Sequence, residues 1–214
     1  MVLCPIFFAI FTPTTIIRAQ NKEFIVGSIL GFYGIENKGD IKDMYSKTNG
    51  TISGTGGLSF GLNAKHDLSK NIYGSFELRY IRKGSIYTFI TNYGTRSWES
   101  IKLDYIEIPF LTGIKISTKK KPFFIEAGFA YARLLSAKVL VSELNKWDSS
   151  IEKNNFKKND ISCVANLKHP INKSEKLLIG LRFSHSLFSI QSLCKLYNMD
   201  YGVEFYYLFN QNIK

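Results

Sequence analysis

Six charged residues lie in segments where apolar and polar residues alternate, and all six fall on the polar face. They could form one enclosed ionic cluster. They are Glu77, Arg79, Glu107, Glu126, Arg182 and Glu204. Ionisable groups enclosed in a membrane protein can mark a gate or a proton path. The same groups can also pair with one another and fill a narrow interior, because unpaired charges there are costly. We favour the second interpretation, a plug of salt bridges completed by Tyr and Ser hydroxyls.

A second candidate site consists of His185 between Ser184 and Ser186. A general base must lie within hydrogen-bonding reach of its nucleophile. In a strand, His185 points to the face opposite its two serine neighbours, so we predict no catalytic residue. Finding His185 inside, beside Ser184 and an acid such as Asp200, would favour an enzyme that acts at the rim of a barrel.

Metal-ligating residue types are scattered along the chain. The three histidines and three cysteines show no ligand spacing: His66, His169, His185, Cys4, Cys163 and Cys194. We therefore predict no metal site and no cofactor. Cys163 and Cys194 could pair in an oxidising compartment, although two free thiols are the simpler expectation.

The strongest structural pattern lies in residues 101–138, where two alternating runs flank the basic turn TKKK at 118–121. Apolar residues occupy one face of these runs: Ile106, Ile108, Phe110, Ile114, Ile116, Phe123, Ile125, Ala127, Phe129 and Tyr131. Period-two alternation predicts strands. The opposite face carries ions and glycines and no second hydrophobic surface. Each run reaches the length of about 9–11 residues that a transmembrane strand needs.

The whole chain contains eight segments of this kind. The predicted strands are 23–34, 55–66, 71–83, 100–116, 122–138, 160–169, 176–188 and 198–209. Short turns at 67–71, 118–121 and 170–175 alternate with long connections at 35–54, 84–99, 139–159 and 189–197. Bacterial barrels use even strand numbers with short periplasmic turns and long extracellular loops. The predicted fold is therefore all-β, an eight-stranded antiparallel up-and-down transmembrane β-barrel over residues 21–214.

Pro109 lies inside the strand predicted at 100–116. Proline cannot donate a hydrogen bond to a neighbouring strand. Because the alternation keeps its phase across Pro109, we expect a local gap in the strand pairing and no bulge.

The N-terminal residues 1–20 combine a short apolar run, VLCPIFFAIF, with TPTTIIRAQ. The run is too short to cross a bilayer as a helix. We predict a cleaved signal peptide ending near Ala19 or Gln20, although no Lys or Arg precedes the apolar core.

Composition limits the partners. The chain is 45% hydrophobic and 14% aromatic, with a formal net charge of +11. Its lysines concentrate in predicted turns and loops, which gives nucleic acid no recognisable platform. Contact with anionic lipid head groups explains the surplus better. We expect outer-membrane lipid as the main partner, and other envelope proteins as partners of the extracellular loops, where Trp147 and mixed charges lie.

Three stretches carry a resemblance to a known family: LDYIEIPFLTGIK followed by PFFIEAGFAYARLLSAK, GGLSFGLNAKHDLSKNIYGSFELRYIRKGS and MDYGVEFYYLF. Together they resemble the PorT-like outer-membrane β-barrel family of Gram-negative bacteria over residues 23–209, and YIEIP (105–109) is the most specific part. The resemblance implies an integral outer-membrane barrel, often of unknown task. In a departure from the family pattern, NQNIK follows Phe209 at the end of the last strand.

Taken together, the sequence indicates a non-enzymatic barrel in the outer membrane with a structural, anchoring or partner-binding role and a lumen filled by side chains. One alternative is a soluble periplasmic, lipocalin-like barrel that binds a ligand, which requires the apolar face to point inward. An outer-membrane enzyme active at its rim is the other.

Overall fold

The computed structural model describes residues 24–39, 51–90, 96–118, 121–141, 146–148, 156–191 and 195–209. Nine strands run through these ranges: β1 (Phe24–Gly39), β2 (Thr51–Asp67), β3 (Ile72–Ile90), β4 (Arg96–Ile116), β5 (Phe123–Val141), β6 (Lys146–Asp148), β7 (Asn159–Pro170), β8 (Leu177–Ser186) and β9 (Leu196–Leu208). No helix in the described part of the chain is long and apolar enough to cross a membrane. The predicted signal peptide at 1–20 lies outside the described residues, and so does Cys194.

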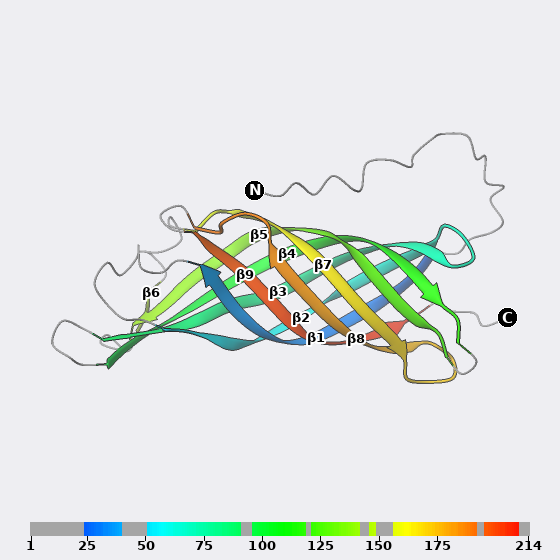
Figure 1. The fold of residues 1–214 in the computed structure, drawn as a ribbon, viewed down its shortest axis with the longest axis horizontal. Coiled ribbons are helices and arrows are strands. Elements are labelled where there is room, and N and C mark those ends of the chain that lie inside the picture. Colours follow the sequence, from blue (N-terminus) through cyan, green and yellow to red (C-terminus); the bar gives the residue numbers. More distant parts are fainter. Residues whose placement is uncertain are drawn as a thin grey trace.

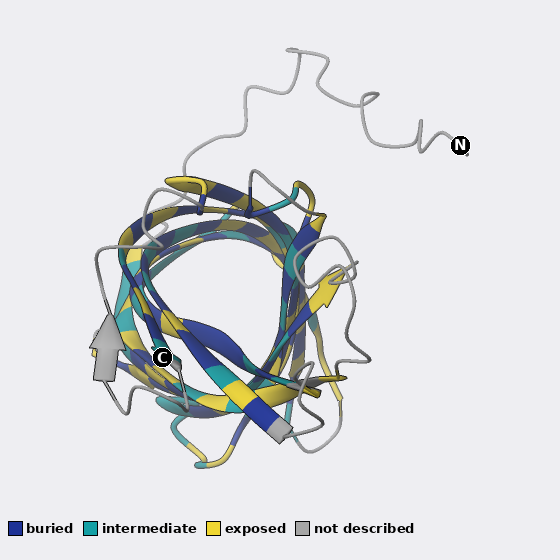
Figure 2. Cartoon of the chain, turned by 90° about the vertical axis from the view of Figure 1, so that its left-hand side faces the viewer, coloured by how far each residue is buried: buried dark blue, intermediate teal, exposed yellow. Residues whose placement is uncertain are grey.

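Eight of the nine strands close into a single barrel. The sheet order is β4-β3-β2-β1-β9-β8-β7-β5, and the pairing of β4 with β5 completes the ring. Every neighbouring pair is antiparallel. Viewed along its axis, the barrel is a closed ring of strands (Figure 2). The predicted eight-stranded antiparallel up-and-down barrel is therefore confirmed, and the three-residue β6 is an addition that pairs with the end of β5.

The two ends of the barrel differ, as Figure 1 shows. The end that carries the connections 68–71, 117–122 and 171–176 is called the turn end, and the opposite end, where β6 lies, is called the β6 end. Strands β1 to β5 contain 16–21 residues, whereas β7, β8 and β9 contain 10–13. One side of the wall therefore extends further toward the β6 end than the other.

The extended strands correct two predicted connections. Residues 35–54 and 84–99 were expected to be loops, but β1 continues to Gly39, β2 begins at Thr51, β3 continues to Ile90 and β4 begins at Arg96. The remaining links, 40–50 and 91–95, are much shorter than predicted. The predicted sorting of connections by length is kept only in part, because the link 91–95, with five residues, is shorter than the six-residue connections 117–122 and 171–176 at the turn end.

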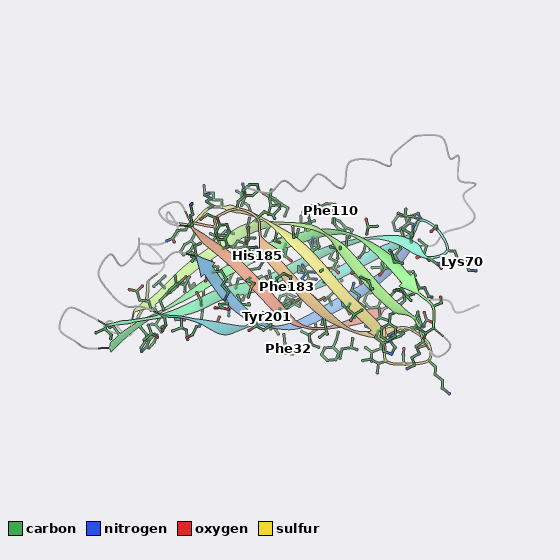
Figure 3. The ribbon with its side chains drawn as sticks, in the orientation of Figure 1. Phe32, Lys70, Phe110, Phe183, His185 and Tyr201 are labelled. Atoms are coloured by element: carbon green, nitrogen blue, oxygen red, sulfur yellow. The ribbon has the colours of Figure 1, made fainter. Side chains whose placement is uncertain are left out.

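The predicted alternation of faces is confirmed in β3, β4 and β5. The outward side chains of residues 72–80, 106–116 and 123–131 are mostly apolar, and we call these three segments the apolar belt. The segments are nine, eleven and nine residues long. These lengths match the length of about 9–11 residues that a transmembrane strand needs. Phe110 is 59% exposed on the outer surface of this belt, and Phe32, Phe183 and Tyr201, labelled in Figure 3, are also exposed on other strands.

Two irregularities interrupt the ladders of β4 and β5. The β3–β4 register passes from Phe76↔Phe110 to Arg79↔Glu107, so pairing is missing around Pro109, while Pro109 still pairs with Ala130 of β5. The predicted gap without a bulge is confirmed at Pro109. A register shift occurs instead between Asp104 and Tyr105, where β5 contains Leu135 as an extra residue. Such a bulge bends a strand and increases its twist.

Candidate functional site: the charged interior of the barrel

All six charged residues predicted for the interior point into the barrel. Their exposed fractions are 0–3%: Glu77, Arg79, Glu107, Glu126, Arg182 and Glu204. They come from β3, β4, β5, β8 and β9. Alternation along a strand sends every second side chain inward, and barrel closure then brings these five strands around one space.

Arg79 lies at the centre of the cluster. Its guanidinium donates to Glu204 at 2.6 Å and to the adjacent Glu77, and it lies 3.9 Å from Glu107. It also donates to the Tyr33 hydroxyl at 2.8 Å. Arg79 of β3 is therefore connected to β1 and β9 through charge-assisted hydrogen bonds, which are among the stronger kinds in proteins, and to β4 through a longer ion pair.

Arg182 makes a second bridge from the opposite side of the barrel. It donates to Glu107 at 2.7 Å and to Glu77 at 3.3 Å. Arg79 and Arg182 share the carboxylates of Glu77 and Glu107 in this way. The predicted salt-bridge network of two arginines among glutamates is thus present and continuous, except that Glu126 joins it through another cation.

Two lysines and Asp200 belong to the network and were not among the predicted site residues, and a second aspartate, Asp160, is also buried in the lumen. Lys168 lies 2.7 Å from Glu126 and 3.5 Å from Glu77, and Lys83 lies 3.1 Å from Glu107 and 2.9 Å from Asp200. Asp160 accepts hydrogen bonds from Ser186 at 2.7 Å and Asn198 at 3.0 Å. The inward parity of the predicted strands is the signal that could have found them.

Hydroxyl groups complete the coordination of the glutamates, as predicted. Tyr33 and Tyr206 both donate to Glu204, and Tyr73 donates to Glu126 at 3.0 Å. The Lys168 ammonium also lies 3.8 Å from the centre of the Tyr206 ring, a favourable cation–π distance. The cost of burying the glutamates is offset because each has at least two cationic or hydroxyl neighbours, although Glu107 Oε2 accepts no hydrogen bond and lies only in an ion pair with Lys83.

Apolar side chains close the lumen on both sides of the ions. Toward the turn end the buried cluster consists of Ile29, Tyr73, Phe124, Leu178, Tyr206 and Leu208. Toward the β6 end a larger cluster contains Tyr33, Ile35, Ile81, Tyr87, Ile101, Leu103, Tyr105, Ala132, Leu134, Ala137, Val139, Phe156, Ile190 and Leu196. A cavity of about 20 Å³ beside Lys65 and Ser75 remains at the turn end, which is room for about one water molecule.

The larger apolar cluster corrects one expectation. The inner face was predicted to carry ions and glycines without a second hydrophobic surface. Toward the β6 end, however, apolar side chains of β3, β4 and β5 point inward, among them Ile81, Leu103 and Val139. These residues lie past the apolar belt, where the outer face no longer meets hydrocarbon. Apolar side chains there are buried by turning inward, as in a soluble barrel.

The inward placement of His185 that the enzyme alternative requires is not found. His185 faces outward and stacks on Tyr197, with ring centroids 6.1 Å apart, whereas Ser184 and Ser186 are 1% exposed and point inward. The parity predicted for these three residues is confirmed. Within the described ranges, His, Cys, Asp and Glu side chains form no group of three that could hold a metal ion.

The family model for the outer membrane protein beta-barrel domain matches residues 18–192. The chain belongs to this family. Its members are integral outer-membrane barrels, so the outward apolar belt faces lipid and the ions lie in the lumen. Among curated proteins, none matches the chain.

The chain is also similar, at low sequence identity, to several solved structures. The attachment invasion locus protein Ail of Yersinia pestis has a TM-score of 0.49 and 11% identity, with 87% of this chain and 99% of Ail covered. Neisserial surface protein A has a TM-score of 0.47 and 10% identity, with 89% and 100% covered. OprG from Pseudomonas aeruginosa has a TM-score of 0.42 and 10% identity, with 87% and 95% covered.

The lipocalin-like alternative required the opposite arrangement of faces. Ile106 is half-buried and Phe110 and Phe205 are 59% and 37% exposed, whereas Glu107 and Arg182 are at most 2% exposed. A ligand-binding barrel of that kind needs an apolar cavity in its centre. In this outer-membrane barrel the corresponding space is occupied by paired ions, so the soluble alternative is not favoured.

Proposed function

We propose that this outer-membrane barrel is a closed anchor that presents its β6 end to partners at the cell surface and does not conduct solutes. The observation that carries the proposal is the continuous ion network across the lumen, from Asp200 and Lys83 through Glu107, Arg182 and Glu77 to Lys168 and Glu126. Apolar clusters cover it on both sides. An interior of eight strands is just wide enough for side chains.

A planar-bilayer recording tests whether the lumen is closed. The purified barrel should give no conductance steps at applied potentials at which a general porin in the same bilayer gives clear steps. Steps of uniform size that follow the amount of inserted barrel would contradict a closed anchor. They would favour the gate interpretation of the same ions.

The orientation is a second part of the proposal, because partner binding needs the β6 end outside. Exposed Lys38 lies near the β6 end of β1, and exposed Lys70 lies in the connection between β2 and β3 at the turn end. Each is replaced by Cys in a chain that carries Cys163→Ser and Cys194→Ser. A membrane-impermeant maleimide should label Lys38→Cys on intact cells and Lys70→Cys only after permeabilisation. The reverse pattern would contradict the orientation.

We also propose that the chain belongs to the PorT-like branch of its family. The segment YIEIP at 105–109 supports this, since Tyr105 and Glu107 lie fully buried inside and Pro109 causes the ladder gap. Co-purification from outer membranes after mild solubilisation would identify associated envelope proteins. A barrel that consistently purifies without any would favour a stand-alone structural role.

A further inference from the structure

A hollow opens in the outer wall of the barrel, in the half of the apolar belt nearer the turn end. Its volume is about 350 Å³, and small residues on three neighbouring strands form its floor: Ala64 of β2, Gly74 of β3 and Thr112 of β4. Gly74 pairs directly with Thr112, and a Cβ added at Gly74 would meet no atom within 4 Å. The hollow therefore exists because these side chains are short, while the strands beneath them remain paired.

Aromatic rings border the hollow on two sides. Toward the turn end, Phe24 stacks on His66 with ring centroids 4.6 Å apart, and toward the middle of the barrel, Phe76 meets Phe110 edge to face at 5.2 Å. Stacked and edge-to-face contacts are the favoured geometries of aromatic pairs. Each ring is held by its partner, so the two rims keep the hollow open between them.

Hydrocarbon surrounds the hollow, because the outward belt of this outer-membrane barrel faces lipid. Atoms that line an unfilled gap lose their dispersion contacts, so an occupant that fills the gap is favoured. An apolar cavity of about 150 Å³ is large enough to hold benzene. The hollow is more than twice that size, which gives room for a stretch of acyl chain.

An exposed cation lies beyond the rim at the turn end. Lys70 belongs to the connection 68–71 between β2 and β3, two of the strands that form the floor, and Figure 3 labels it at this end of the barrel. The amides of Leu68 and Ser69 both donate to the Ile72 carbonyl at 2.9 Å, which fixes the turn. The position of Lys70 relative to the hollow is therefore set by the backbone.

The charge of Lys70 is not used within the wall. It has no ion-pair partner among the described residues, and the nearby carboxylate of Asp67 already lies 3.5 Å from the Lys65 ammonium. A lipid whose chain fills the hollow places its head group at the level of the turn. A phosphate there would meet a cation whose neighbouring carboxylate is already paired.

We propose that the hollow and Lys70 together bind one phospholipid of the inner leaflet, with an acyl chain on the floor and the phosphate at Lys70. The proposal rests on the orientation proposed above, which puts the turn end in the periplasm. The hollow itself does not choose between lipids, because every membrane lipid has acyl chains. Lys70 supplies the choice, since an ammonium group binds phosphate as a point charge.

The first test maps where a lipid chain lies. The full barrel is placed in phosphatidylcholine vesicles that contain a small fraction of phosphatidylglycerol with a photoreactive diazirine in its acyl chain, and the cross-linked peptides are identified by mass spectrometry. Cross-links should concentrate at 64–66, 74–76 and 110–112. Ala64→Phe/Thr112→Phe, which fills the floor, should lose most of them.

A matched control puts the same ring elsewhere on the belt. Leu181 of β8 and Val203 of β9 pair with each other on the opposite side of the ring of strands. Leu181→Phe/Val203→Phe should keep the cross-links in the hollow. The mobility of unheated samples on gels shows that each variant is folded before it is compared.

The second test asks whether Lys70 recognises phosphate, and it does not depend on the filled variant. A diacylglycerol with the same photoreactive chain lacks the phosphate. One basic side chain near a membrane surface contributes about fivefold, so phosphatidylglycerol should give about five times more cross-links in the hollow than diacylglycerol. Lys70→Gln should bring this ratio to about one, whereas Lys173→Gln, which removes an exposed lysine from another turn at the same end, should leave it unchanged.

Three results would each overturn the proposal. The cross-links could be spread evenly around the belt, or Lys70→Gln could leave the ratio unchanged. A second copy of the chain could fill the hollow instead, and Thr112→Cys in the chain with Cys163→Ser and Cys194→Ser would then form disulfide-linked dimers in vesicles. Labelling that puts the turn end outside would also end the assignment to the inner leaflet, even if the cross-links persist. The labelling result separates failure of the orientation from failure of the site.

Discussion

Replacing Arg79 by Met tests whether the lumen ions act as one network. Glu204 has Arg79, at 2.6 Å, as its ion-pair partner among the described residues, and its other partners are the Tyr33 and Tyr206 hydroxyls. Removing Arg79 therefore leaves a buried carboxylate without a cation at ion-pair distance, with Arg182 and Lys168 farther away. Breaking a buried pair in this way costs about 3–5 kcal/mol, and we expect Arg79→Met to lie near the upper value.

Arg182→Met is the matched control, because its partners keep other cations. Without Arg182, Glu107 still has Lys83 at 3.1 Å, and Glu77 still has Lys168 at 3.5 Å and Arg79 beside it. We expect a cost of about 3 kcal/mol, near the lower value for a broken buried pair. The difference between the two variants comes from the pairing pattern, because both remove one arginine from the same lumen.

The single variant Glu204→Gln and the double variant Arg79→Met/Glu204→Gln complete a thermodynamic cycle. The double variant removes both members of the pair, so it should be more stable than Arg79→Met alone by about 2–3 kcal/mol, within the usual coupling of contacting residues. Urea unfolding in phospholipid vesicles, followed by tryptophan fluorescence and by the mobility of unheated samples on gels, measures each value. Equal costs for the two arginines, or additive costs in the cycle, would refute the network.

Two further predictions test the faces of the wall in the same unfolding assay. Phe110→Lys puts a charge on the belt, where Phe110 is 59% exposed, and should lower the free energy of unfolding by about 2–4 kcal/mol. Lys102→Leu, past the belt, should change it by less than about 1 kcal/mol. Equal effects of the two substitutions would contradict the assigned belt. Gly113→Val should cost about 1–3 kcal/mol by overpacking, because a Cβ at Gly113 lies 2.2 Å from the Tyr73 ring, whereas Gly74→Val meets nothing within 4 Å and should be close to neutral.

The alternation of residue types was sufficient to predict the strands of the belt and the six inward ions. It works there because hydrocarbon outside and ions inside give the two faces opposite character. It could not predict which ions meet, since Arg79 and Glu204 are 125 residues apart in the chain. That contact depends on how far the strands slide past one another when the ring closes.

Lys83 and Lys168 were missed for a different reason. Both have inward parity, but a long lysine is usually assigned to the surface, because its charge is almost never fully buried unless it is paired. Here the pairing exists: Lys83 meets Glu107 and Asp200, and Lys168 meets Glu126. In a narrow barrel, the position of a residue in the two-residue alternation should therefore decide whether its side chain is assigned to the lumen, even when the residue is a lysine.

The strand ends 84–90 and 96–99, toward the β6 end, were missed because the two faces lose their distinct character there. Already in 81–83 and 102–103 the inward residues Ile81 and Leu103 are apolar while Arg82 and Lys102 point outward, and farther along Ser85 and Ser97 are buried. The outer face is mixed, since Trp98 and Ile90 are also exposed. A prediction that assigns apolar residues to the lipid-facing side therefore cannot tell the two faces apart in these segments, although the strands continue.

The inward apolar clusters and the ion network have one physical cause and together define the size of the barrel. Because both ends of the lumen are closed by apolar side chains, water cannot neutralise the ions, and they must reach one another across the interior. They do so between strands three or four places apart in the ring: β3 with β9 through Arg79 and Glu204, and β3 with β8 through Glu77 and Arg182. Barrel diameter grows with strand number, so a wider ring would separate these pairs and leave each charge buried alone.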